Sequence, residues 1–153
     1  MPVYDHEKSI GFLMGDVSRL MKRAFDTRIK ELGISTSQWI VLMQICRQDG
    51  LSQIELAERV EIEQSTLVRH LDNLHMQGLV ERKPDRLDRR IKRVYLKDKN
   101  HPLIKALEVE AEEARAMMLD KVGDEELKNA MHVLRHIKIN LLNYSMKVEK
   151  QNE

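Results

Sequence analysis

Residues 52–96 read SQIELAERVEIEQSTLVRHLDNLHMQGLVERKPDRLDRRIKRVYL, and this stretch decides the fold. It predicts two short helices joined by a tight turn, followed by a hairpin of two strands with alternating apolar residues. The first helix begins with a capping box, because Ser52 is followed three residues later by Glu55. The turn is predicted at Glu61-Ile62 and the second helix from about Glu63 to Gln77. This order predicts a helix-turn-helix with a hairpin directly behind it.

The second helix of this pair is amphipathic. At about 100° per residue, Leu67, Leu71 and Leu74 fall within roughly 60° of one another and are expected to face the core. Polar residues occupy the other side, with Ser65, Arg69 and Asp72 opposite the leucines and Thr66, His70 and Asn73 flanking them.

In a helix-turn-helix, the amino-terminal part of the second helix meets the base edges of DNA. The residues suited to this task are Ser65, Thr66, Arg69 and His70. Arg69 fits a bidentate contact with guanine, which gives ~1–3 kcal/mol of discrimination. Taken alone, the same residues could simply form the solvated side of an amphipathic helix.

The hairpin holds a concentration of positive charge that the whole chain, at +1, does not reveal. Its strands are predicted at Leu79–Lys83 and Lys92–Leu96, with a polar tip between them at Pro84–Arg90. Residues 81–93 include three acidic and seven basic side chains, a net charge of +4 that leaves −3 for the rest of the chain. The basic residues are Arg82, Lys83, Arg86, Arg89, Arg90, Lys92 and Arg93. Charged strands are often only solvated sheet edges, but this cluster behind a helix-turn-helix favours contact with a polyanion.

Helices are also predicted on both sides of this stretch. Apolar residues at three-and-four spacing predict one helix from about Glu7 to Leu32, ended by Gly33, and another from Ser37 to about Arg47. Beyond the hairpin, helices are predicted from about Asn100 to Val122 and from Glu125 to Val148. The predicted fold class is therefore mainly α with a small β hairpin.

Composition narrows the class of protein. The chain has 153 residues, 42% hydrophobic and 33% charged, which suits one soluble globular domain and not a disordered chain. No apolar run approaches the ~20 residues that span a bilayer, and the first ten residues lack the apolar core of a secretory signal. The single cysteine, Cys46, leaves no intrachain disulfide and fits a reducing compartment, so we expect a cytoplasmic protein. The sequence shows no nucleophile with its base, no paired catalytic carboxylates and no glycine-rich phosphate loop, so neither an enzyme nor a cofactor is predicted.

Four segments resemble the MarR family of winged helix-turn-helix transcriptional regulators, most closely its SlyA-like subgroup. They are SQWIVL from Ser37, SQIELA from Ser52, IEQSTLVRHLDNL from Ile62 and DRRIKRVYL from Asp88. The similarity extends more weakly over almost the whole chain, and DRR at 88–90 is its most specific part.

The resemblance implies that the protein binds double-stranded DNA. Arg89 would enter the minor groove, and Asp88 with Arg90 would brace the wing or hold phosphate. The predicted DNA-contact residues of the wing are Arg86, Arg89 and Arg90. Two positions depart from the family's pattern. Glu61 stands where relatives often carry a turn glycine, which affects turn geometry, and Ser65 replaces a proline, which affects base preference.

The resemblance also implies a homodimer. The chain is predicted as a single domain, 1–153, with a DNA-binding winged lobe at 34–98 and dimerisation helices at 7–32 and 100–148. Two recognition helices about 34 Å apart would then read a pseudo-palindrome with half-sites one helical turn apart. A monomeric helical bundle with the same apolar stripes is the alternative. The stretch 108–126, with eight acidic residues, is expected to face away from DNA.

Family resemblance further implies a ligand pocket between the dimer region and the DNA-binding lobe, often occupied by small aromatic carboxylates. Trp39 and Met43 are the candidate contacts, and Arg19 is the candidate partner of the carboxylate. A plain core position is the alternative for Trp39. A ligand that changed the separation of the two lobes would change their fit to fixed half-sites.

Other functions on the same scaffold stay open. One is a helical protein-interaction module that kept the winged fold without DNA binding. Another is an oxidant sensor at Cys46, although a thiol in a buried-looking helix is normally inert. A metal sensor could use His132 and His136, which lie four residues apart on a helix. No Glu or Cys stands at ligand spacing from them, so no metal site is predicted.

Overall fold

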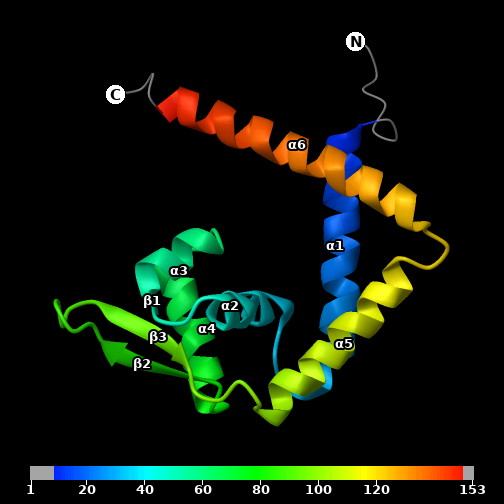
Figure 1. The fold of residues 1–153 in the computed structure, drawn as a ribbon. Helices are drawn as coiled ribbons and strands as arrows, with labels where there is room; N and C mark the ends of the chain where they lie inside the picture. The colour runs from blue at the N-terminus through cyan, green and yellow to red at the C-terminus, as the bar shows by residue number, and fades with distance from the viewer. Residues whose placement is uncertain (1–8, 150–153) are drawn as a thin grey trace. The chain divides into compact units, whose positions relative to one another are not determined.

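The computed structural model describes residues 9–149, apart from the side chains of residues 146, 148 and 149. The chain forms two compact units, divided between Arg115 and Ala116. In order, the elements are α1 (Ile10–Ile29), the 3-10 turn η2 (Lys30–Leu32), α2 (Thr36–Arg47), β1 (Leu51–Ser52), α3 (Gln53–Arg59), α4 (Gln64–Met76), β2 (Val80–Pro84), β3 (Lys92–Leu96), α5 (Pro102–Met118) and α6 (Asp124–Glu149) (Figure 1). The fold is mainly α with a small sheet, as the sequence predicts.

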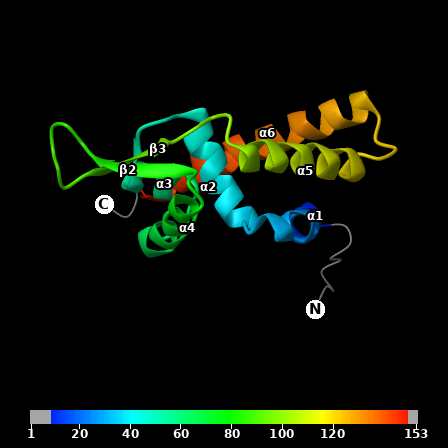
Figure 2. The same cartoon turned by 90° about the horizontal axis from the view of Figure 1, so that it is seen from below.

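The sheet has three antiparallel strands in the order β1-β3-β2. In the hairpin, Val80 pairs with Leu96 and Pro84 pairs with Lys92, in agreement with the predicted strands. The third strand, β1, is not predicted by the sequence, and it adds Leu51 opposite Val94. Seen from two directions, the tip of the hairpin extends beyond α2, α3 and α4 (Figures 1 and 2). We call residues 80–96 the wing.

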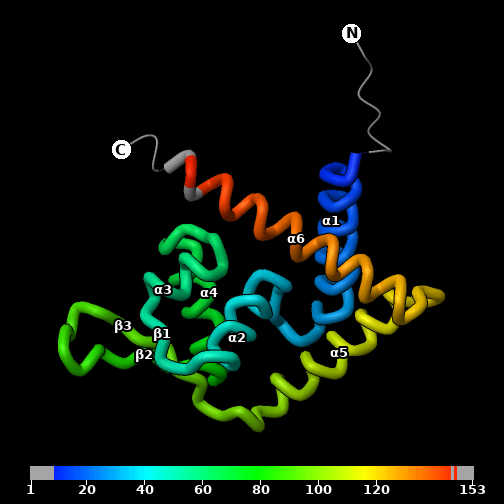
Figure 3. The backbone as a smooth tube through the Cα atoms, turned by 45° about the horizontal axis from the view of Figure 1, so that its top comes forward, coloured from blue at the N-terminus to red at the C-terminus, as the bar shows by residue number. Residues whose placement is uncertain are grey.

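The core of the first unit lies where α2, α3 and α4 gather beside the sheet (Figure 3). Its fully buried side chains include Ile29, Leu42, Ile45, Leu51, Leu56, Leu67, Leu71, Leu74, Leu79, Val80, Val94 and Leu107. The leucine side of α4 is thus buried, as its spacing predicts. One apolar residue of α3 is different, because Ile54 lies about 115° round the helix from the buried side and is half exposed.

The first helix ends three residues before the predicted Leu32, because a 3-10 turn takes the place of its last turn. α1 ends at Ile29 and is followed by the 3-10 turn, which Gly33 closes with a left-handed φ of 71°. The next helix begins one residue before the predicted Ser37, because Ser35 and Gln38 form a capping box at its start. The predicted first turn of α1, at residues 7 and 8, lies outside the described residues.

Ion pairs join α1 to α5 within the first unit. Arg28 Nε lies 2.9 Å from a carboxylate oxygen of Glu110, and the same guanidinium pairs with Glu113. Two carboxylates of the acid-rich stretch are therefore held against α1. The helix α5 ends at Met118, earlier than the predicted Val122, and Lys121 adopts a left-handed φ of 61° in the turn that follows.

The second unit consists mainly of α6. None of the side chains described in this helix is buried, although its sequence carries a regular apolar stripe. Exposed apolar residues on it include Met131, Leu134, Ile139, Leu141, Leu142 and Tyr144. Among the described residues, no helix is both long and apolar enough to cross a membrane.

Candidate nucleic-acid interface

The polar side of α4 is free to meet a partner. One side of the helix is completely buried through Leu67, Leu71 and Leu74. The opposite side therefore faces solvent. The exposed stripe of α4, which we define by Ser65, Arg69, Asp72 and Met76, runs along that side. Thr66 beside it is also exposed, and His70 is half-buried. The four predicted base-reading residues therefore lie on one continuous face.

His70 has a different electrostatic character from its arginine neighbour. Partial burial lowers the pKa of its imidazole below the ordinary value of 6.5. At neutral pH the ring is therefore uncharged, with one nitrogen able to donate and the other able to accept a hydrogen bond. Arg69 remains the permanent cation of this face.

The turn before α4 keeps the geometry that a glycine would favour. Glu61 stands at this position with a left-handed φ of 54°. The turn is closed by backbone hydrogen bonds, with Glu61 N–H donating to Glu58 at 3.2 Å and Ile62 N–H donating to Ala57 at 3.1 Å. The departure from the family's glycine therefore places a strained glutamate here without opening the turn.

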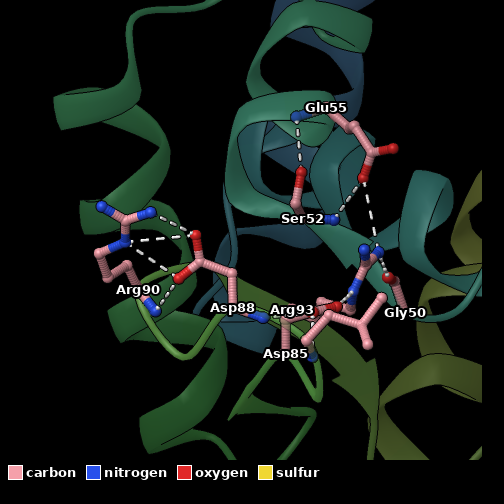
Figure 4. A network of polar contacts seen from close by, with 8 residues as sticks. Gly50, Ser52, Glu55, Asp85, Asp88, Arg90 and Arg93 are labelled. Carbon is pink, nitrogen blue, oxygen red and sulfur yellow. Dashed lines mark hydrogen bonds and ion pairs between the residues drawn. The ribbon is translucent and has the colours of Figure 1, made fainter.

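The tip of the wing is organised by one carboxylate. Asp85 accepts hydrogen bonds from the backbone N–H groups of Leu87, at 2.8 Å, and Asp88, at 3.1 Å. Its other oxygen accepts from the Arg93 guanidinium (Figure 4). The hydrogen bond from Arg93 and those from the backbone lower the pKa of Asp85 to about 2. The carboxylate is therefore charged at neutral pH and holds the tip in one conformation.

A second carboxylate of the tip binds Arg90. Arg90 Nε donates to Asp88 Oδ1 at 3.0 Å, and Arg90 Nη2 donates to Asp88 Oδ2 at 2.8 Å, which is a bidentate arrangement. The Arg90 backbone N–H donates to Asp88 Oδ1 at 3.0 Å as well. These bonds lower the pKa of Asp88. Asp88 and Arg90 thus contact each other within the tip of the wing, and whether the pair braces the wing or holds phosphate stays a prediction.

The base of the wing is tied to the start of α3. Arg93 Nη1 donates to the carbonyl of Gly50 at 2.9 Å and lies 3.8 Å from the Glu55 carboxylate. Glu55 in turn caps α3 through Ser52, which confirms the predicted capping box (Figure 4). Gly50 has φ 79°, and a Cβ there would lie 3.1 Å from the Tyr95 ring, so a larger residue would disturb this junction. The wing is therefore anchored to the helix-turn-helix.

These contacts separate the seven cations of the wing into two groups. Four have carboxylate partners, namely Arg82 with Asp72, Lys83 with Glu81, Arg90 with Asp88, and Arg93 with Asp85 and Glu55. The other three, Arg86, Arg89 and Lys92, are exposed and have no partner within residues 9–149. All three carboxylates of the segment are thereby neutralised within the protein. The charge that remains available to an anion is positive.

One contact of this surface could not be predicted from the sequence. Arg82 on β2 forms an ion pair with Asp72 on the exposed stripe of α4. The helical wheel places Asp72 on this side of the helix, but no spacing rule links it to a residue ten positions further on. Helical rules connect only residues three or four apart.

The candidate ligand residues lie on α1 and α2. Arg19 is exposed and forms an ion pair with Asp16 one turn earlier. Trp39 is half-buried, with its ring centre 6.2 Å from that of Phe25, and Met43 is half-buried on the same helix. A surface hollow of about 370 Å³ lies elsewhere, at the turn between α3 and α4, where Ile54 and Ile62 contribute to its lining.

The candidate sensor residues are Cys46, for oxidants, and His132 with His136, for a metal ion. Burial, followed by the charge of Glu108, raises the pKa of the Cys46 thiol, which makes it less nucleophilic. The rings of His132 and His136 lie 4.4 Å apart, centre to centre, on the surface of α6. In the described part of the chain, no three His, Cys, Asp or Glu side chains gather in a way that could hold a metal ion.

Comparison with known proteins agrees with this geometry. The sequence model of the MarR family matches residues 32–91, from the end of the 3-10 turn η2 to the tip of the wing. The solved transcriptional regulator PA3341 is 37% identical, with 88% of this chain and 99% of that chain covered and a TM-score of 0.78. A SlyA-like transcription regulator from Listeria monocytogenes is 25% identical over 94% of this chain and 95% of that chain, with a TM-score of 0.80.

A third similar structure is that of BpsR from Bordetella bronchiseptica, whose DNA binding is regulated by 6-hydroxynicotinic acid. It shares the fold at 20% identity over 89% of this chain and 97% of that chain, with a TM-score of 0.77. The helix-turn-helix, the anchored basic wing and the extent of the similarity lead to one assignment. The chain belongs to the MarR family of winged helix-turn-helix transcriptional regulators.

Proposed function

We propose that this regulator binds pseudo-palindromic duplex DNA as a homodimer, with α4 in the major groove and the wing on the phosphates or in the adjacent minor groove. A small aromatic carboxylate would modulate the binding. The protein would act as a regulator without catalysis.

The observation that carries the DNA proposal is the division of charge on the wing. All its acidic side chains form ion pairs with other residues of the wing. By contrast, Arg86, Arg89 and Lys92 are exposed and have no partners in the described chain. Neutralising phosphates releases counterions, and this supplies most of the affinity of such surfaces for nucleic acid. The exposed stripe of α4 adds donors that can distinguish bases, above all Arg69.

The dimer proposal rests on exposed apolar surface outside the core. In the amino-terminal part of α1 the apolar side chains are exposed to solvent, with Leu13 59% and Leu20 60% exposed. In α6 the same is true, with Leu141 61% exposed. Contiguous apolar faces of this length mark association sites. A two-fold interface would cover them and present two copies of α4 to successive turns of one DNA face.

The effector proposal keeps the candidates Arg19, Trp39 and Met43. Trp39 is only half-buried against the core, which is compatible with contact to a planar ligand, and an arginine is the usual partner of a carboxylate. BpsR, which has the same fold, responds to an aromatic carboxylate. A ligand shifts DNA affinity only by binding two arrangements of the protein with different strength.

Fluorescence anisotropy with random 30-base-pair duplexes, over a series of salt concentrations, tests the DNA proposal directly. We expect affinity that falls steeply as salt rises, and a duplex selected from a random pool that binds at least a hundredfold more tightly. Absence of binding at low salt would favour the protein-interaction module instead.

A further inference from the structure

Asp72 is an unexpected residue on a surface proposed to face DNA. It lies on the exposed stripe of α4, three residues after Arg69, and its side chain is 55% exposed. An uncompensated carboxylate there would repel the phosphates on either side of the groove. Its presence therefore calls for a compensating group close by.

That group comes from the wing. Arg82 on β2 forms an ion pair with Asp72, and only 24% of its side chain is exposed. In the sheet, Arg82 lies opposite Val94, which is fully buried. The arginine therefore extends from a strand whose position is fixed by the core.

The pair is one of three links between α4 and the segment that runs from Leu79 into β2. Near the end of the helix, Leu79 N–H donates to the Leu74 carbonyl at 3.0 Å. One step further, His75 Nδ1 lies 3.0 Å from the Val80 carbonyl oxygen. The Asp72–Arg82 pair is the only one of the three made by two charged side chains. It is also nearest, along the helix, to the base-reading positions.

From this arrangement we propose that Asp72 and Arg82 are positioning residues that set sequence specificity. Their ion pair fixes the wing relative to α4, so that the wing and the base-reading side chains meet the same DNA turn in register. It also neutralises Asp72 where phosphates approach. The inference rests on the proposed DNA binding. It adds two residues that would contribute to sequence specificity without contacting the bases. The pair is partly exposed, so its contribution to global folding stability is expected to be small, and the effect looked for is on the position of the wing.

Charge-matched variants test the proposal. Asp72→Asn raises the net charge by one, Arg82→Gln lowers it by one, and the double variant keeps it unchanged. Each is measured by anisotropy on a duplex selected with the wild-type protein and on a random duplex. Lys22→Gln is the matched control for loss of a cation, because Lys22 forms an exposed ion pair with Asp26 on α1.

The expected result is a loss of discrimination in all three variants. The ratio of affinities for the selected and the random duplex should fall about three- to tenfold, even though Asp72→Asn binds the random duplex more tightly. Arg82→Lys, which keeps the charge, should retain most of the ratio. Lys22→Gln should leave it unchanged.

A double variant with the wild-type ratio would overturn the proposal, because only net charge would then matter. Circular dichroism confirms that each variant is folded, and Asp72→Ser and Arg82→Met, which also remove the ion pair, replace any that is not. If the wild-type protein shows no affinity for either duplex at low salt, the proposed function fails. If the wild type discriminates and the variants do so equally well, only this inference fails.

Discussion

Arg90 donates two hydrogen bonds to the Asp88 carboxylate, from Nε at 3.0 Å and from Nη2 at 2.8 Å. Arg89, its neighbour in the chain, has no partner among the residues described. Two adjacent arginines thus have different states before any ligand arrives. The Arg90 side chain is still 92% exposed, but two of its donors already point at a carboxylate, whereas all the donors of Arg89 can bind a phosphate or enter a groove. The tip of the wing thus presents one arginine whose charge is paired with a carboxylate and one whose charge is unpaired.

Arg89→Ala should therefore weaken binding to most DNA sequences. In the proposed homodimer each protomer loses one phosphate contact, so the slope of log affinity against log salt should fall by about one unit per protomer, or about two in all. Anisotropy titrations at four salt concentrations measure the slope. Arg89→Lys should restore the slope, since the charge is kept. Lys105→Ala, on α5 outside the predicted DNA-binding lobe, should leave it unchanged. If affinity and slope of Arg89→Ala match the wild type, the wing does not meet DNA as proposed.

Arg69→Ala should act on specificity more than on affinity for random sequences. Arg69 lies on the exposed stripe of α4, where a bidentate contact with guanine gives ~1–3 kcal/mol of discrimination. Selection from a random pool with the variant should show relaxed preference at one position in each half-site. Equal weakening on every duplex would mean that Arg69 contacts only the backbone.

Leu141→Asp should separate the proposed dimer. Leu141 is 61% exposed on α6, and burying a leucine in an interface contributes ~1.5–3 kcal/mol. The dissociation constant of the dimer should rise at least about tenfold, as measured by light scattering after size exclusion. Asn140→Asp, the exposed neighbour on the same helix, is the control for the added charge. A Leu141→Asp protein that remains as dimeric as this control would place the interface elsewhere.

The periodic features of the chain were predictable because they depend on near neighbours. The buried leucines of α4, the capping box at Ser52 and the two long strands of the wing follow spacing of two to four residues. The start of α2 was also encoded locally. Ser35 and Gln38 form its capping box, although the pattern of apolar residues placed the start near Ser37.

The remaining features depend on residues far apart in the chain. The strand β1 has only two residues, too few for any alternation, and it pairs with a strand more than 40 residues later. Arg93 reaches the carbonyl of Gly50 across a similar separation. Charge counting correctly located the cluster of cations but could not distinguish Arg93, which braces the wing, from Arg89. That distinction needs the folded hairpin.

Acid should loosen the tip of the wing before the fold is lost. The pKa of Asp85 in the folded wing is about 2, below its ordinary value of 3.8, because of the Arg93 hydrogen bond and those from the backbone. A lowered folded pKa means that the stabilisation is complete above about pH 4 and disappears as the pH falls toward 2.

Backbone amide shifts of Leu87 and Asp88, followed by NMR from pH 6 to 2, measure this loosening, because both N–H groups donate to Asp85. They should be constant above pH 4 and change toward pH 2. In Asp85→Asn the change of the Leu87 amide should be lost, while the Asp88 amide still reports the titration of its own carboxylate. A midpoint near 3.8 in the wild-type protein would show that the Arg93 contact is not maintained in solution.

Glu61→Gly should stabilise the folded protein. Glu61 holds a φ of 54°, where a side chain clashes with its own backbone and glycine does not. Relief of this strain outweighs the extra entropy of glycine in the unfolded chain, for an expected gain of ~0.5–1 kcal/mol in the free energy of unfolding. Urea unfolding followed by circular dichroism measures it. Glu61→Ala removes the same charge but keeps Cβ, so it should give no comparable gain. Equal stabilisation by alanine and glycine would assign the effect to charge, and the strained turn would then have no energetic consequence.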